Sequence, residues 1–130
     1  MSRAGMPTGA ALRAFAIVPI LCAAVGAHAG EADVIAARAS RGPDGKWSFA
    51  VTIRSNDKGW KYYCDRFEVR APDGRLLGVR RLLHPHEDEQ PFTRELDGVG
   101  IPPGLPGVLI RAHHNARGYD GDVLKLQLPR

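Results

Sequence analysis

Apolar and polar residues alternate most clearly between Lys46 and Arg54. One set of alternate positions holds Trp47, Phe49, Val51 and Ile53, and the other set holds mainly polar residues. Side chains of a β-strand point to opposite faces in turn, so this pattern predicts a strand with one buried face.

The same criterion predicts seven short strands. No segment after Gly30 sustains helical periodicity, and turn-forming residues recur about every ten positions. Two near-identical segments, 42–45 and 71–74, place proline and glycine where tight turns favour them. The predicted strands are Ala32–Ser40, Lys46–Arg54, Trp60–Arg70, Arg75–Leu83, Pro91–Leu96, Val108–His114 and Val123–Leu128. We therefore predict an all-β, seven-stranded, immunoglobulin-like sandwich.

The C-terminal third resembles the second half of a fibronectin type III domain. The residues that carry this resemblance are Leu96–Val99, Pro103-Gly104, Val108–Ala112 and Asn115–Tyr119. The tyrosine that the family has at the start of its sixth strand is missing, because Gly107 or Val108 falls there. The resemblance implies a fibronectin type III-like fold and no particular function.

The first 29 residues have the pattern of a signal peptide. Arg3 and Arg13 precede or flank an apolar run, and Ala27-His28-Ala29 offers the small residues that signal peptidase requires. Cleavage after Ala29 would leave a single β-sandwich domain, residues 30–130, in the periplasm or outside the cell. Two alternatives are an uncleaved anchor and a lipid on Cys22, although Leu21 stands where a lipidation motif prefers a small residue.

The charge and composition of the chain argue against some classes of partner. Removing Arg3 and Arg13 lowers the formal net charge from +4 to about +2, which argues against nucleic-acid binding. No second hydrophobic run follows the first, so we expect no transmembrane segment in the mature chain. The mature chain keeps one cysteine, Cys64, which can form no internal disulfide and is buried, paired with a partner, or a soft metal ligand.

The densest run of chemically capable side chains is 82–94, LLHPHEDEQPFTR. With Trp60, Tyr63 and Asp65, it is similar to small uncharacterised exported bacterial proteins that share a HPH…EQPFTR core, and that similarity implies no mechanism. In the predicted sandwich this segment shares one end with two other connections, 55–59 and 115–121.

Alternation predicts which of these side chains point inward. It places Asp65 and His114 inward and Cys64 and His113 outward. An inward Asp65 would need a histidine ring, a metal or an arginine such as Arg94, because a buried carboxylate must be paired. The residue before a proline favours extended backbone, so the two histidines of His84-Pro85-His86 should share one face.

These predictions support two hypotheses of different classes. In the first, the protein binds a transition metal, zinc or copper, through His84, His86, His114 and Asp65, with Cys64 and His113 as further candidates. In the second, it is a non-catalytic module that binds another exported or envelope protein, and the His/Asp network is purely structural. A hydrolase built from Cys64 and a histidine lacks any oxyanion loop in the sequence, so we do not expect an enzyme. The metal, the partner and the oligomeric state stay open at this point.

A basic face is also expected on the strands around residues 66–70 and 111. Glu68 is in outward phase there among four arginines, which predicts a partly self-paired surface. These arginines are Arg66, Arg70, Arg80 and Arg111.

Overall fold

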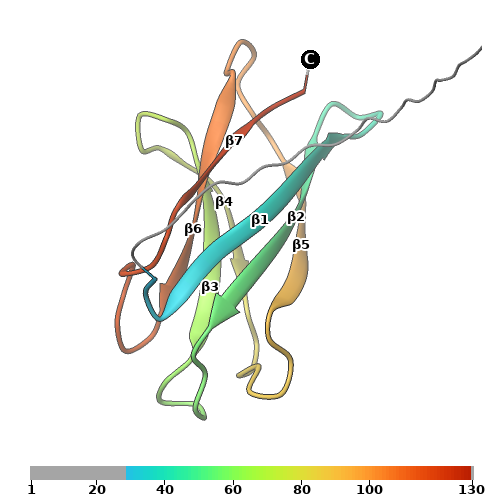
Figure 1. Ribbon diagram of the computed structural model, residues 1–130. Coiled ribbons are helices and arrows are strands. Elements are labelled where there is room, and N and C mark those ends of the chain that lie inside the picture. The colour runs from blue at the N-terminus through green and yellow to red at the C-terminus, as the bar shows by residue number, and fades with distance from the viewer. Residues whose placement is uncertain (1–28, 130) are drawn as a thin grey trace, which may run out of the picture.

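A computed structural model describes residues 29–129, which form two antiparallel sheets packed face to face (Figure 1). The first sheet has the order β1-β2-β5, and the second has the order β4-β3-β6-β7. The strands are β1 (Ala32–Arg41), β2 (Trp47–Ser55), β3 (Cys64–Arg70), β4 (Leu76–Arg81), β5 (Phe92–Val99), β6 (Gly107–His114) and β7 (Leu124–Gln127). This part of the chain contains no helix, so the all-β prediction with seven strands is confirmed. The predicted signal peptide lies outside the described residues except for Ala29.

The core lies between the two sheets and follows the alternation of the sequence. Phe49, Val51 and Ile53 of β2 are fully buried, as are Phe67 and Val69 of β3. Burying a large apolar side chain contributes about 1.5–3 kcal/mol, so these inward positions supply much of the stability of the sandwich. The sequence pattern and the packing agree on both central strands.

The third strand is shorter than predicted. It begins at Cys64 rather than Trp60, because the chain before it closes into a tight loop. The Lys58 amide donates to the Tyr62 carbonyl at 2.6 Å, and the Tyr62 amide donates to the Gly59 carbonyl at 3.2 Å. Gly59 has φ of +82°, a conformation that glycine adopts without strain. These backbone groups therefore have partners within the loop and not in the sheet.

A β-bulge at the start of β3 reverses the predicted phase of two residues. Cys64 pairs with His114 and Arg66 pairs with His113, so Asp65 is an extra residue on the β3 side. An extra residue turns the preceding side chain to the other face. Cys64 is consequently fully buried, and Asp65 is half-buried on the outer face of the sheet. The predicted inward Asp65 and outward Cys64 are both wrong for this reason.

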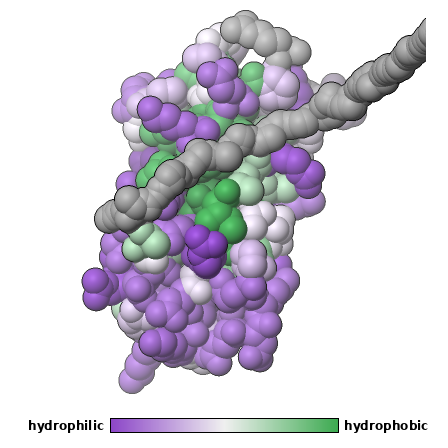
Figure 2. All heavy atoms as spheres, in the orientation of Figure 1, coloured by the Kyte–Doolittle hydropathy of each residue, from purple (hydrophilic) through white to green (hydrophobic). Residues whose placement is uncertain are grey.

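Three connections meet at the lower end of the molecule in Figure 1. They are residues 56–63, 82–91 and 115–123, and we call this end the loop pole. Figure 2 shows that this end of the visible face is largely hydrophilic, whereas hydrophobic residues gather nearer the middle and upper part. The predicted meeting of these connections at one end is confirmed.

Candidate functional site

Asp57 is the buried centre of the loop pole. Its Oδ1 accepts hydrogen bonds from Ser55 Oγ at 2.8 Å and from the Cys64 amide at 3.0 Å. Its Oδ2 accepts from the His86 amide at 2.8 Å. One carboxylate thus joins the end of β2, the start of β3 and the segment 82–91, and its burial is compensated by three donors.

Gln90 holds the same segment from its other end. Its Nε2 donates to the His86 carbonyl at 2.8 Å and to Ser55 Oγ at 3.2 Å, while its Oε1 accepts from the Ser55 amide at 2.8 Å. Asp57 and Gln90 together fix the backbone of 86–90 against the end of β2. Several polar groups of this segment therefore stabilise the conformation of the segment itself.

The two histidines of the segment have adjacent rings but different burial. His86 is 4% exposed and stacks on Phe92, with ring centroids 4.0 Å apart and planes 10° apart. His84 is exposed, its ring centroid lies 4.5 Å from that of His86, and its Nδ1 lies 3.0 Å from the Pro85 carbonyl oxygen. The two rings are adjacent, as expected of side chains that share one face, yet only His86 is buried, because only His86 stacks on Phe92.

Neither ring nitrogen of His86 has a hydrogen-bond partner among the described residues. Burial lowers the pKa of His86, and the neighbouring Arg94 and His84 side chains lower it further. The imidazole is therefore held in its neutral form at neutral pH and packs as an aromatic ring.

His114 is fully buried at the end of β6, as predicted, but both of its ring nitrogens are occupied. Its Nε2 lies 3.2 Å from the Asn56 carbonyl oxygen, and its Nδ1 accepts from the Ala116 amide at 3.2 Å. Neutral imidazole has one donor and one acceptor, and these two bonds use both. His114 therefore links two loops and has no lone pair left for a metal.

Asp65 pairs with the other histidine of β6. His113 Nδ1 lies 2.6 Å from Asp65 Oδ1 on the outer face, and Arg66 lies 3.6 Å from Asp65 Oδ2. Of the three kinds of partner considered for an inward Asp65, a histidine is the one found, although the pair lies on the outer face. Arg94 pairs instead with Glu89 at 3.0 Å. The bulge causes this arrangement, because it places Asp65 and His113 on the same face.

Cys64 is a protonated, inaccessible thiol. Burial raises its pKa to about 12, and the nearby charge of Asp57 raises it in the same direction. Its Sγ lies 3.7 Å from the Arg66 carbonyl oxygen, to which it donates. A thiolate is the form that binds metals and attacks electrophiles, so Cys64 acts here as a small core residue.

The residues predicted to share a metal are thus divided among three places. His84 and His86 lie beside Phe92, His114 is bonded between loops, and Asp65 is on the outer face. Within residues 29–129, no group of three or more His, Cys, Asp or Glu side chains is placed to hold a metal ion. The geometry gives the metal hypothesis no support.

Asn115 joins the remaining pair of loops. It exchanges two hydrogen bonds with the Tyr63 backbone, both 2.9 Å long, and its Nδ2 donates to the Trp60 carbonyl at 3.0 Å. The roles of Asn115 and Asp57 were not predicted from the sequence; only the connections that contain them, 115–121 and 55–59, were placed at this end. Their residue types were a usable signal, since Asn and Asp side chains commonly bond to loop backbone.

The hydrogen-bonded connections of the loop pole carry exposed apolar side chains. Within the described chain six large hydrophobic residues are exposed, and four of them belong to the loop pole. Trp60 is 64% exposed and Leu83 is 75% exposed, and the other two are Tyr119 and Val123. A shallow hollow lies beside Trp60 and is lined by Gly59 and residues 84–89.

A second polar cluster covers the outer face of the β4-β3-β6-β7 sheet. Glu68 accepts hydrogen bonds from Arg70 at 2.7 Å, Arg111 at 3.0 Å and the Tyr119 hydroxyl at 2.6 Å. Burial by itself would raise the pKa of Glu68, but these hydrogen bonds outweigh it and lower the pKa to about 2. The predicted self-paired face is confirmed, except that Arg80 donates to the Glu95 carbonyl of the other sheet.

Comparison with known proteins gives one informative similarity. The chain is 37% identical over 76 residues to a protein of Halomicrobium mukohataei that is named "Putative lipoprotein". The aligned region covers 58% of this chain and 37% of that protein, so the chain spans little more than a third of the relative's length. No family model and no solved structure matches the chain. No helix in residues 29–129 is long and apolar enough to cross a membrane.

Proposed function

We propose that this protein is a non-catalytic binding module of the cell envelope, which contacts another exported or envelope protein through its loop pole. The module is a single domain, residues 30–130, and the preceding segment directs its export. The observation that carries the proposal is a set of loops fixed by Asp57, Gln90 and Asn115, above which Trp60 and Leu83 are exposed.

The strand order supports a fibronectin type III-like version of the sandwich. The fourth strand pairs with β3, and β5 pairs with β2, so the sheets contain three and four strands. In the immunoglobulin constant type the fourth strand instead pairs with the fifth. Domains of this architecture serve mainly as scaffolds for loops, and their function depends on what those loops carry.

Rigid loops favour binding because fewer conformations are lost when a partner docks. Exposed aromatic and aliphatic side chains surrounded by polar groups are typical of interaction surfaces. At the loop pole, Trp60 and Leu83 have that character, and acidic residues 87–89 line the same hollow as Trp60. The hydrogen-bonded network beneath them supports the hypothesis that the histidines stabilise the loops and do not bind a metal.

The chemistry of the site favours binding over catalysis. Cys64 is buried and has a raised pKa. Both ring nitrogens of His114 are hydrogen-bonded, and the buried His86 ring stacks on Phe92. A general base needs a free ring nitrogen within reach of substrate, and a nucleophilic cysteine needs a thiolate. These three side chains therefore serve better as framework than as reactants.

The envelope location rests on two observations. The N-terminal 29 residues have the pattern of an export signal, and the chain is similar to a protein named as a lipoprotein. The second observation adds weight to an attachment at Cys22 as the alternative to cleavage after Ala29. Mass spectrometry of the exported protein distinguishes these outcomes by the mass of its N-terminal peptide.

Site-specific photo-crosslinking in the native host tests the proposed surface. A photoreactive residue at position 60 or 83 is expected to yield a discrete cross-linked protein. The same residue at Arg38, which is exposed on β1, serves as the matched control and is expected to yield none. The proposal is wrong if both loop-pole positions yield no adduct, or if Arg38 yields the same one.

A further inference from the structure

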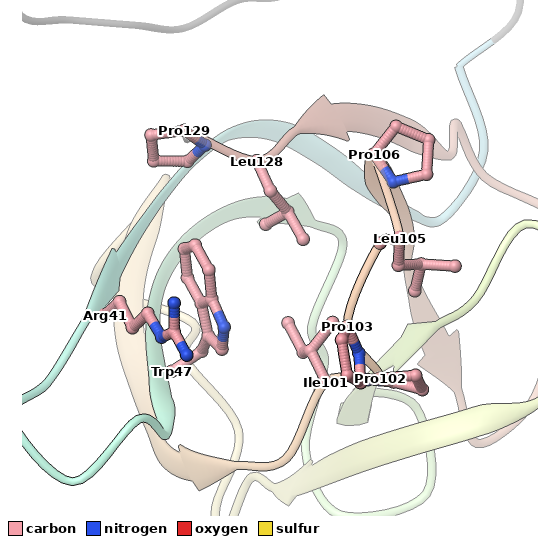
Figure 3. A pocket seen from close by; sticks show the side chains of 10 residues that line it. Arg41, Trp47, Ile101, Pro102, Pro103, Leu105, Pro106, Leu128 and Pro129 are labelled. Atoms are coloured by element: carbon pink, nitrogen blue, oxygen red, sulfur yellow. The ribbon is translucent and has the colours of Figure 1, made fainter.

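A second candidate site lies at the end of the sandwich opposite the loop pole. A cavity of about 330 Å³ opens there between the two sheets (Figure 3). Its wall is formed by the ends of β1 and β2, the β5–β6 connection and the residues after β7. The lining side chains are mostly apolar and include Trp47, Ile101, Leu105, Leu128 and several prolines. A volume of this size suits a small ligand of about ten non-hydrogen atoms.

The polar side chains of this cavity are hydrogen-bond donors. Arg41 and Trp47 are cross-strand neighbours in the β1–β2 register, so the guanidinium and the indole lie at the same wall. Trp47 is 8% exposed, and its indole carries a single hydrogen-bond donor, Nε1–H. Figure 3 shows the nitrogen-bearing edge of this indole turned across the cavity toward Ile101. Both groups donate and neither accepts.

Arg41 is also the one charged side chain among the lining residues. The ion pairs of the described chain are made by other basic side chains, so Arg41 keeps its charge available at the cavity mouth. Prolines 102, 103, 106 and 129 contribute no backbone N–H to the wall. A ligand that matches these groups has an apolar body and an anionic end that accepts hydrogen bonds.

We propose that this cavity binds a small amphiphilic carboxylate. Its hydrocarbon part lies between Trp47, Ile101 and Leu128, and its carboxylate accepts hydrogen bonds from Trp47 Nε1 and Arg41. The apolar contact supplies most of the affinity, while the two donors select an anion over a neutral or cationic analogue of the same length.

Octanoate is a suitable probe, with octan-1-ol, octylamine and acetate as matched comparisons. The chain has two tryptophans, so a Trp60→Phe variant leaves Trp47 as the single indole whose fluorescence reports on the cavity. We expect octanoate to change this emission with saturation at one equivalent, and calorimetry on the unsubstituted protein to give the same stoichiometry. Octanol and octylamine should bind about tenfold more weakly, and acetate should not bind at the same concentrations.

Two arginine variants identify the anion contact. Arg41→Gln is expected to weaken octanoate binding about tenfold and to leave octanol binding unchanged, because a charge-assisted hydrogen bond is lost. Arg54→Gln removes another exposed arginine, which belongs to β2 and lies outside the cavity, and it should change neither affinity. Equal affinity for octylamine, a non-saturating emission change, or an Arg41→Gln variant with unchanged octanoate affinity would each overturn the proposal.

Discussion

Glu68 is the strongest electrostatic anchor on the outer face of the four-stranded sheet, and its removal should cost measurable stability. The carboxylate is 4% exposed and accepts hydrogen bonds from Arg70, Arg111 and Tyr119. Glu68→Gln keeps the shape of the side chain but removes its charge. The arginines then keep at most an amide oxygen as acceptor and lose the negative charge that balances them, so they repel one another.

The pKa of Glu68 sets the magnitude. The difference between the ordinary value of 4.5 and about 2 corresponds to at most about 3 kcal/mol of stabilisation at neutral pH. The arginine partners are a quarter to a third exposed, so solvent screening reduces our expectation to about 2 kcal/mol. For a domain of this size that loss lowers Tm by roughly 10 °C.

The pH dependence has a defined direction. A carboxyl group whose pKa is lowered by folding stabilises the protein fully above pH 4.5 and loses this effect as the pH falls toward 2. The difference in unfolding free energy between wild type and Glu68→Gln should therefore be greatest at pH 7 and shrink steadily below pH 4.5. Urea unfolding followed by tryptophan fluorescence at pH 7, 5, 4 and 3 measures this difference.

A matched control separates this effect from the general loss of a negative charge. Glu95 is exposed on β5, and Glu95→Gln should change the unfolding free energy by less than about 0.5 kcal/mol at any of these pH values. A cost of Glu68→Gln as small as that of Glu95→Gln would show that the charge of Glu68 does not stabilise the sheet. A cost that is the same at pH 3 as at pH 7 would show this as well.

Three further predictions concern the loop pole. Asp57→Ala should lower the unfolding free energy by about 3 kcal/mol in urea titrations, because three donors lose a buried acceptor; a loss under about 1 kcal/mol would contradict the anchoring role. His86→Phe should be at least as stable as wild type by the same assay, since both ring nitrogens lack partners and the stack on Phe92 is kept; a marked loss would reveal a missed polar contact. Cys64 should react with a thiol reagent at pH 8 only after unfolding, because burial raises its pKa to about 12; rapid labelling of the native protein would show that it is accessible.

Local sequence was sufficient for the positions of the strands. The inward residues Phe49, Val51 and Ile53 were identified by alternation alone, because one face of each strand has to be apolar to pack against the other sheet. The errors occurred at strand ends. Trp60–Tyr63 has strand-like composition, but its backbone groups bond within the loop and to Asn115.

The chemistry of the candidate site was harder to predict because it depends on a single inserted residue. The bulge at Asp65 moves that carboxylate to the outer face and leaves Cys64 in the core. The alternation of apolar and polar residues does not show where a β-bulge inserts an extra residue into one of two paired strands. The predicted set of metal ligands therefore contained side chains that point to opposite faces.

The sequence by itself determined the alternation, the turns and the meeting of three connections at one end, since these follow from backbone geometry and the burial of apolar side chains. Only the tertiary structure decided which polar groups are partners. Asp57 and His86 are 29 positions apart, and Arg41 and Trp47 line a cavity with residues beyond 100. A difference of a few tenths of an ångström between distant segments decides whether a hydrogen bond forms or a cavity remains. Those distances are set only when the two sheets pack together.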